Sequence, residues 1–258
     1  MKSNKTAEIR EDLRRRIKAG EYQPGDRLPS LTELATAYGA TSRSAPTRAV
    51  KDLVNQGLLT MVHGKGIFVR SRVVVSRDLV AGLRMEYFAA VHGREVEGGL
   101  FEAMTGTKTD VAVGYDWMEA SEQVAQALDL TPGDEVLRRT FEYIVDGVPH
   151  QIARSYLAAA TARQAGLTSK DCERKGVGSI AHLHAAAGIT VDRGRLRIET
   201  RAPTAEESHQ LAIPGGTPVF ETSRVLFRVD EPVELMTSII PGDRIGYVFD
   251  VDLRETPQ

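Results

Sequence analysis

Residues 21–35 read EYQPGDRLPSLTELA, and this stretch decides the fold of the N-terminal part of the chain. Its first nine residues are rich in proline and glycine, which is typical of a turn-rich connection. Ser30 and Glu33 then form a capping-box pattern, in which each side chain satisfies the backbone amide of the other residue. The stretch therefore predicts a short helix that begins after Ser30 and ends at Gly39.

Two further helices and a hairpin are predicted around this one. Apolar residues spaced four apart predict a helix over residues 6–19. Ser42 is a good N-cap for a third helix, which Gly57 ends. Residues 58–61 and 67–70 are strand candidates with a glycine-rich tip between them. Three short helices followed by a hairpin describe a winged helix-turn-helix.

The charge of the chain is divided unevenly. Of the 258 residues, the first 72 carry 14 Lys and Arg against 7 Asp and Glu, a net charge of +7. The rest carries −9, so the whole chain has a net charge of −2. A small basic unit joined to a larger acidic one is typical of a nucleic-acid-binding domain attached to a domain with another task.

The third helix and the hairpin hold the residues suited to DNA. Arg43 lies near the start of the helix, where it can approach the major groove and donate two hydrogen bonds to a guanine edge. Lys65 adds positive charge at the hairpin tip, where glycines allow a close approach to the phosphates. The candidate DNA-binding residues are Thr32, Ser42, Arg43, Ser44, Thr47, Arg48, His63, Gly64 and Lys65.

This region resembles the DNA-binding domain of the GntR family of bacterial transcription regulators. The resemblance rests on EYQPGDRLPS at 21–30, ELA at 33–35, GLL at 57–59 and HGKGIFV at 63–69. The sequence departs from the family pattern in three places, one of which is a turn before the third helix that is one residue longer than usual. Thr32 stands where the family usually has arginine, and Thr47-Arg48 stand where the recognition helix usually has two adjacent arginines. These departures concern the operator sequence rather than DNA binding itself.

The rest of the chain contains an internal repeat. Residues 128–136, LDLTPGDEV, are repeated as LAIPGGTPV at residues 211–219. Each copy follows a hydroxyl N-cap, Ser121 or Thr204, and continues into a strand, a turn with proline and a second strand. A further helix is predicted over residues 179–187. Two such halves predict an α+β domain with an antiparallel sheet and helices packed on it.

The repeat, with PVE at 232–234 and PGDR at 241–244, resembles the effector-binding UTRA domain of the HutC subfamily of GntR regulators. The resemblance implies a chorismate-lyase-like fold, a homodimer, and an effector bound between the two repeats. Several members bind phosphorylated sugars with two arginines and a glutamate placed around the proline of the first repeat. Those positions here hold Phe141, Tyr143 and Ala153.

The changed positions alter the expected effector. Aromatic side chains suit an apolar ligand, whereas arginine suits phosphate and carboxylate. We therefore expect a small-molecule effector that is not a sugar phosphate. The candidate effector-binding residues are Phe141, Tyr143, Ser179, Arg224 and Glu234. A structural role also fits some of them, because Phe141 and Tyr143 suit a sheet core and Arg224 and Glu234 suit an ion pair.

These observations predict three parts. Residues 1–70 form a winged helix-turn-helix domain, residues 71–77 a linker, and residues 78–258 an effector-binding and dimerisation domain. Residues 94–117 match no pattern that assigns them a role. The whole is read as a ligand-responsive repressor that binds a palindromic double-stranded DNA operator as a homodimer.

Other functional classes fit less well. The alternative is an enzyme of chorismate-lyase-like fold that acts on a small aromatic or carboxylate substrate. The sequence offers no nucleophile–base pair, phosphate loop or metal-ligand spacing, so we expect no cofactor and no metal. It has no apolar run long enough to span a membrane and no export signal, and it has a single cysteine, Cys172. These features predict a cytoplasmic protein without a membrane partner.

Overall fold

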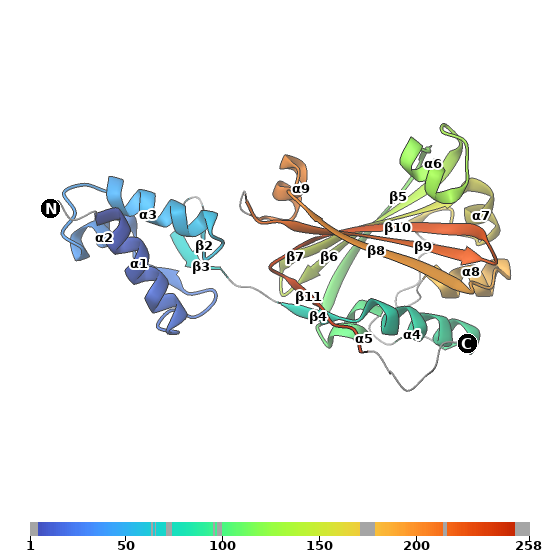
Figure 1. The fold of residues 1–258 in the computed structure, drawn as a ribbon, viewed down its shortest axis with the longest axis horizontal. Helices are drawn as coiled ribbons and strands as arrows, with labels where there is room; N and C mark the ends of the chain where they lie inside the picture. Colours follow the sequence, from blue (N-terminus) through green and yellow to red (C-terminus); the bar gives the residue numbers. More distant parts are fainter. Residues whose placement is uncertain are drawn as a thin grey trace. The chain divides into compact units, whose positions relative to one another are not determined.

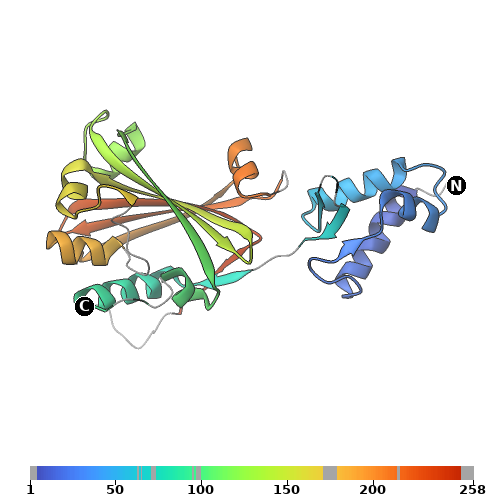
Figure 2. The same cartoon turned by 180° about the vertical axis from the view of Figure 1, so that it is seen from behind.

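The computed structural model describes residues 5–62, 64, 66–70, 74–94, 96, 100–170, 179–213 and 216–250. The chain divides into two compact units (Figures 1 and 2). The N-terminal unit comprises residues 1–73 with 202–218, and the effector unit comprises residues 74–201 with 219–258. No helix among the described residues is long and apolar enough to cross a membrane.

The first part of the N-terminal unit, residues 5–70, combines three helices with a three-stranded sheet. Its elements are α1 (Lys5–Lys18), β1 (Arg27–Leu28), α2 (Leu31–Ala37), α3 (Ser44–Asn55), β2 (Leu59–Val62) and β3 (Gly66–Val69). β3 pairs antiparallel with both β1 and β2. Leu13, Leu34 and Leu53 bring the three helices into one core, which Leu59 and Ile67 extend to the sheet. The predicted winged helix-turn-helix is confirmed.

Capping explains where the second and third helices begin. The capping box of α2 is formed, with the Glu33 amide donating to Ser30 Oγ at 3.3 Å and the Ser30 amide donating to Glu33 Oε2 at 2.7 Å. The prediction of Ser42 as the N-cap of α3 is wrong. Arg43 takes that place because its carbonyl oxygen accepts the first intrahelical hydrogen bond, from the Thr47 amide at 2.9 Å, although its side chain makes no capping bond.

The elements that follow along the chain build a larger α+β arrangement. They are β4 (Val75–Arg77), α4 (Leu79–Val91), α5 (Leu100–Thr105), β5 (Thr109–Glu119), α6 (Glu122–Leu128), β6 (Glu135–Val145), β7 (Val148–Ala158), α7 (Ala159–Gln164), α8 (Ser179–Ala187), β8 (Arg193–Arg201), α9 (Ala205–Gln210), β9 (Val219–Arg228), β10 (Glu231–Pro241) and β11 (Ile245–Tyr247). All of them except α9 lie in the effector unit.

Six antiparallel strands form the main sheet of the effector unit, in the order β5-β6-β7-β10-β9-β8. The predicted repeat is confirmed, and each half also has a strand before its helix. The halves are β5-α6-β6-β7 and β8-α9-β9-β10, and they meet where β7 pairs with β10. Ser121 and Thr204 cap α6 and α9 through their hydroxyls, as predicted.

Helices lie on both faces of this sheet (Figures 1 and 2). We call the face that carries Leu137, Leu157 and Leu226 the inner face; these residues pack in one core with Ile180 and Leu183 of α8. α4 lies on the same side of the sheet and packs against α8. α6 packs on the opposite face, in a second core. The α+β class predicted from the repeat is confirmed.

A short parallel pair joins the two ends of the effector unit. β4 pairs with β11, with Val75 opposite Ile245 and Arg77 opposite Tyr247. Residues 75–77, expected as part of the linker, thus have a partner strand, whereas residues 71–73 lie outside the described residues. The unassigned residues 94–117 hold α5 and most of β5.

Candidate DNA interface and effector site

α3 presents a polar face opposite its buried one. Val50 and Leu53 are completely buried, whereas Arg43, Ser44 and Arg48 are exposed. Neither arginine side chain forms an ion pair or hydrogen bond with another residue that the structure describes. Both guanidinium groups are therefore available for phosphates or base edges.

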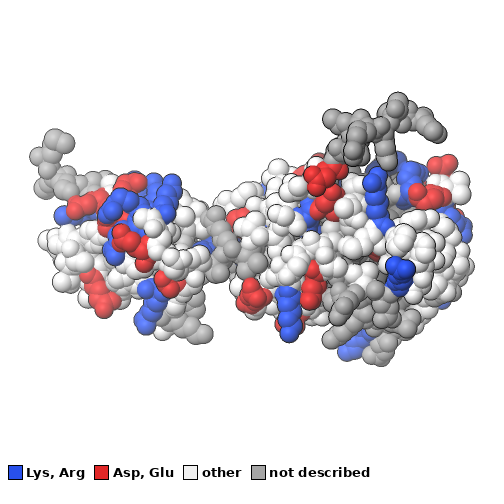
Figure 3. Space-filling model, turned by 90° about the horizontal axis from the view of Figure 1, so that it is seen from below, with Lys and Arg blue, Asp and Glu red and all other residues white. Residues whose placement is uncertain are grey.

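The arginines of α1 differ, because each has a carboxylate partner. The pairs are Arg10 with Glu11 and Asp52, Arg14 with Glu11, Arg15 with Asp12, and Arg16 with Glu21. Basic and acidic side chains are correspondingly interspersed on the drawn face of the N-terminal unit (Figure 3). The charges of the four α1 arginines are thus compensated by nearby carboxylates. Those of Arg43 and Arg48 have no carboxylate partner among the described residues.

The other candidates on α2 and α3 are placed as follows. Thr32 is exposed on α2. The hydroxyls of Ser42 and Ser44 lie 2.8 Å apart, so they hydrogen-bond to each other at the start of α3. The Thr47 hydroxyl donates to the Arg43 carbonyl oxygen at 2.6 Å and is only partly exposed. Thr47 therefore holds the first turn of α3.

The hairpin between β2 and β3 forms the wing. Gly64 is exposed at its tip with a φ of 72°, and His63 and Lys65 lie outside the described residues. Gly66 has a φ of 132°, and a Cβ there would lie 2.9 Å from Arg27 Nε. Arg27 therefore lies against the base of the wing. Sequence reasoning missed this arginine because its strand has only two residues and was read as a connection.

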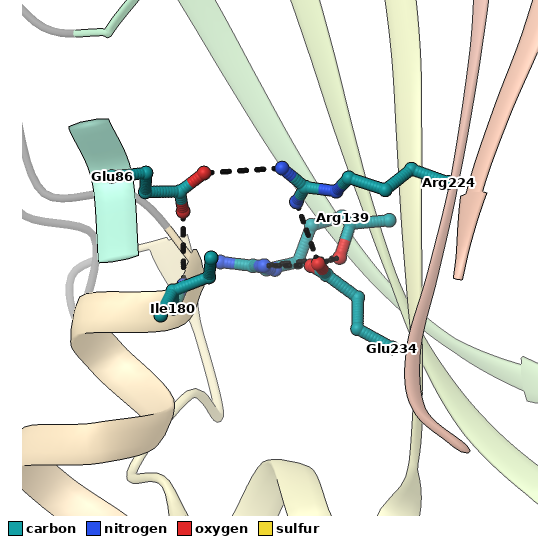
Figure 4. A network of polar contacts seen from close by, with 6 residues as sticks. Glu86, Arg139, Ile180, Arg224 and Glu234 are labelled. Atoms are coloured by element: carbon teal, nitrogen blue, oxygen red, sulfur yellow. Dashed lines mark hydrogen bonds and ion pairs between the residues drawn. The ribbon is translucent and has the colours of Figure 1, made fainter. Parts of the chain in front are cut away.

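Four charged side chains meet on the inner face of the sheet (Figure 4). We call Glu86, Arg139, Arg224 and Glu234 the charged quartet; they come from α4, β6, β9 and β10. Arg139 Nη2 donates to Glu234 Oε1 at 2.9 Å, and Arg224 Nη2 donates to Glu234 Oε2 at 2.8 Å. Arg224 Nη1 donates to Glu86 Oε2 at 3.1 Å. Two guanidinium groups and two carboxylates therefore balance each other.

Further hydrogen bonds complete the quartet. Ser155 Oγ donates to Glu234 Oε1 at 2.6 Å, and the Ile180 amide at the start of α8 donates to Glu86 Oε1 at 2.9 Å. Glu234 is completely buried, while 14% of the Arg224 side chain is exposed. Burial alone would lower the pKa of Arg224, but Glu86 and Glu234 more than offset it, and the pKa is raised.

The quartet joins two predicted residues and adds others that sequence reasoning missed. Arg224 and Glu234 were expected, and the structure brings them into direct contact. Arg139 lies two residues from Leu137 and two from Phe141 along β6. Residues two apart in a strand share a face, and this spacing is the signal that places Arg139 on the inner face. Glu86 carries no comparable signal, because its helix was not predicted.

The aromatic candidates lie beside the quartet on the inner face. Phe141 is 8% exposed, and the guanidinium carbon of Arg139 lies 5.4 Å from the centre of its ring. Tyr143 lies two residues along β6, with its ring centre 5.2 Å from that of Phe101 on α5. Ser179 is the first residue of α8. The inner face thus combines aromatic surface with a balanced set of charges.

Among the residues that the structure describes, no group of three or more His, Cys, Asp or Glu is placed to hold a metal ion. Cys172 lies outside the described residues.

Both units match known families. Residues 5–69 match the family described as "Bacterial regulatory proteins, gntR family", and residues 109–245 match the UTRA domain. The chain is 27% identical to the HTH-type transcriptional repressor NagR of Bacillus subtilis, over 95% of this chain and 93% of NagR. It is 29% identical to the histidine utilization repressor of Pseudomonas putida, over 92% of this chain and 88% of the repressor.

A solved structure shares the fold over almost the whole length. PhnF from Mycobacterium smegmatis matches with a TM-score of 0.54 and 22% identity, over 95% of this chain and 99% of PhnF. The resemblance to HutC-type regulators is confirmed. The alternative of an enzyme is not supported, because NagR and the histidine utilization repressor are both named repressors. The chain therefore belongs to the GntR family of bacterial regulatory proteins with a UTRA domain, and it is a ligand-responsive, DNA-binding transcription regulator.

Proposed function

We propose that the N-terminal unit binds its operator through the exposed start of α3 and through the wing. Arg43 and Arg48 support this most directly, because their exposed guanidinium groups have no partner among the described residues. Ser44 adds a hydroxyl at the helix start, and Arg27 adds a charge beside the wing. The remaining contacts are proposed for Thr32, Ser42, Thr47, His63, Gly64 and Lys65.

The operator is palindromic in this proposal, and the regulator binds it as a homodimer. One winged helix reads only a few base pairs, so two copies related by a two-fold axis are needed for specificity. Residues 71–77 link the DNA-binding domain, residues 1–70, to an effector-binding and dimerisation domain, residues 78–258. The proposal draws on the family for the dimer and on recognition geometry for the palindrome.

The effector binds at the inner face of the sheet, against Phe141 and Tyr143 and close to Ser179. Arg224 contacts it, since this is the member of the quartet with exposed surface, and Glu234 orients Arg224. Sugar phosphates are disfavoured at the quartet, because its two guanidinium groups and two carboxylates already balance each other. A more apolar small molecule is favoured by the aromatic neighbours.

Effector binding releases the operator by shifting the protein between two arrangements. A shift from mostly bound to mostly free requires an effector that binds the released arrangement about 10⁴-fold more tightly. The reversal of operator binding by a small molecule is therefore the property to test.

An electrophoretic mobility shift with DNA from upstream of the regulator's own gene tests the first part. We expect a shifted band at nanomolar protein, and the absence of any shift at micromolar protein would contradict operator binding. Calorimetry with sugar phosphates and with apolar metabolites tests the second part. Tight binding of a sugar phosphate by the wild type would contradict the proposed effector class. The variant Phe141→Arg should bind sugar phosphates more tightly than the wild type does.

A further inference from the structure

Arg77 is a partly buried cation with no carboxylate partner among the residues of the effector unit that the structure describes. It ends β4, and its Nη1 donates to Gln151 Oε1 at 2.9 Å. Its guanidinium carbon lies 5.3 Å from the centre of the Phe101 ring. Its Nε is buried and has no hydrogen-bond partner in the described part of the chain. No carboxylate pairs with it there either.

The two arginines of the charged quartet differ from Arg77 in having carboxylate partners. Arg139 and Arg224 each contact a carboxylate within 3.1 Å. Burial lowers the pKa of Arg77, Arg224 lowers it further, and Tyr143 and Tyr247 only partly offset this. An unpaired charge in such a position is unfavourable, and proteins normally compensate it.

The Tyr247 hydroxyl is a second hydrogen-bond donor without an acceptor in the described part of the chain. It stands opposite Arg77 in the pairing of β4 with β11. Its hydroxyl is buried and has no hydrogen-bond partner among the described residues. Burial raises the pKa of Tyr247 to about 12, so its hydroxyl stays protonated and can donate. A guanidinium N–H and a phenol O–H on paired positions are thus both without an acceptor among the described residues, and a bound ligand could satisfy them.

An amide and several aromatic rings surround Arg77 and Tyr247. Gln151 Nε2 donates to Ser238 Oγ at 3.3 Å, which fixes the amide so that its oxygen faces Arg77. The ring centre of Phe101 lies 5.2 Å from that of Tyr143, and the ring of Tyr247 stacks edge-on to Phe220 at 5.3 Å. Aromatic surface therefore adjoins the unpaired donors.

We propose that Arg77 and Tyr247 bind the anionic group of the effector, and that this effector is a small monocarboxylate with a planar, apolar body. A carboxylate fits the guanidinium fork and accepts from the phenol, while the aromatic neighbours contact the body. A phosphate dianion fits less well, because Arg77 is a single positive charge. The identity of this ligand as the effector rests on the proposed function; the carboxylate site itself does not.

The place of Arg77 in the chain gives this site a route to the DNA-binding domain. β4 is the first element after residues 71–73, so a carboxylate held between Arg77 and Tyr247 fastens that strand to β11. Binding at the site therefore acts on the strand that directly follows the first connection between the two units.

Thermal unfolding of the full-length protein tests the site with two probes, benzoate and its neutral analogue benzamide. At about ten times its Kd, benzoate should raise the midpoint of the effector unit by roughly 3–6 °C, and benzamide should raise it less. Arg77→Met should abolish the difference between the probes. Arg197→Met, which removes an exposed arginine paired with Glu199 on β8, should preserve it. Three outcomes would overturn the proposal. They are equal shifts from both probes, no shift with benzoate at concentrations up to about 50 mM, and a benzoate shift that persists in Arg77→Met.

The unliganded variants give a second readout. Arg139→Met leaves Glu234 short of a partner and should lower the midpoint by roughly 10 °C. Arg77→Met removes an uncompensated charge and should leave the midpoint close to that of the wild type. An equal loss in both variants would assign Arg77 a structural role and overturn the proposal. Operator binding is measured separately, so its failure would contradict the proposed function without affecting the benzoate result.

Discussion

Arg224 and Glu234 lie on the neighbouring strands β9 and β10, with Arg224 Nη2 2.8 Å from Glu234 Oε2 in the interior of the effector unit. Arg139 shares the same carboxylate from the other side. Glu234 therefore holds Arg224 of its own repeat and, through Arg139, connects the second repeat to the first. Removal of its charge leaves the two guanidinium groups of the quartet with one carboxylate, Glu86, which contacts Arg224.

Glu234→Gln should lower the free energy of unfolding by about 3–5 kcal/mol, because it leaves a buried positive charge unpaired while the shape of the side chain is kept. Urea denaturation followed by circular dichroism measures this loss. The double variant Glu234→Gln with Arg139→Gln removes one charge of each sign and should recover part of it. A Glu234→Gln variant within 1 kcal/mol of the wild type would show that the quartet contributes little to stability.

The sequence predicted Arg224 and Glu234, with an ion pair between them as one reading, but it did not predict their further partners Arg139 and Glu86. Both lie in the recognisable second repeat, whereas Glu86 lies on α4, for which no helix was predicted. Contact between them depends on the register of β9 and β10, which carries a bulge between Pro232 and Glu234. A bulge reverses the face of every residue beyond it, and no local pattern announces it.

Local signals were more reliable in the N-terminal unit. The capping box at Ser30 and Glu33, and the glycine at position 57, act within a few residues and were read correctly. β1 was missed because two residues show no alternation and its pairing with β3 is a long-range contact. Arg27 was missed as a candidate DNA contact for the same reason.

His150 should make the effector unit sensitive to mild acid. Its Nε2–H donates to the Arg244 carbonyl oxygen at 3.0 Å, and burial lowers its pKa to about 4, an effect that this hydrogen bond only partly offsets. The unfolded chain has a histidine pKa near 6.5 and binds the proton more readily. Stability is therefore full above pH 6.5 and should fall by about 1–2 kcal/mol between pH 6.5 and pH 5.

His150→Gln provides the control, because the glutamine amide can donate to the same carbonyl and does not titrate. Urea denaturation at half-unit pH steps should show a shallower loss for this variant than for the wild type. Identical pH profiles for the two proteins would assign the acid sensitivity to other groups.

Val229 occupies an unfavourable backbone conformation at the turn between β9 and β10. Its φ is 59°, a left-handed value that is costly for a β-branched residue, and its side chain is 72% exposed. Its amide donates to Asp192 Oδ2 at 2.6 Å, a bond that any residue except proline can make. Val229→Asn should therefore stabilise the protein by about 1 kcal/mol. Calorimetry should show no gain for Val74→Asn, an exposed valine without a positive φ, and equal effects would contradict the argument.

Arg43 and Arg15 separate DNA recognition from simple loss of charge. Both are exposed arginines of the N-terminal unit, but Arg15 is paired with Asp12 whereas Arg43 has no partner among the described residues. Arg43→Ala should weaken operator binding by about 1–3 kcal/mol and relax the preference at one base position. Arg15→Ala makes the same change in net charge and should weaken binding by less than about 0.5 kcal/mol. Fluorescence anisotropy with the operator and with single-base variants measures both effects. Equal losses for the two variants, or unchanged operator affinity in Arg43→Ala, would move the recognition surface away from the start of α3.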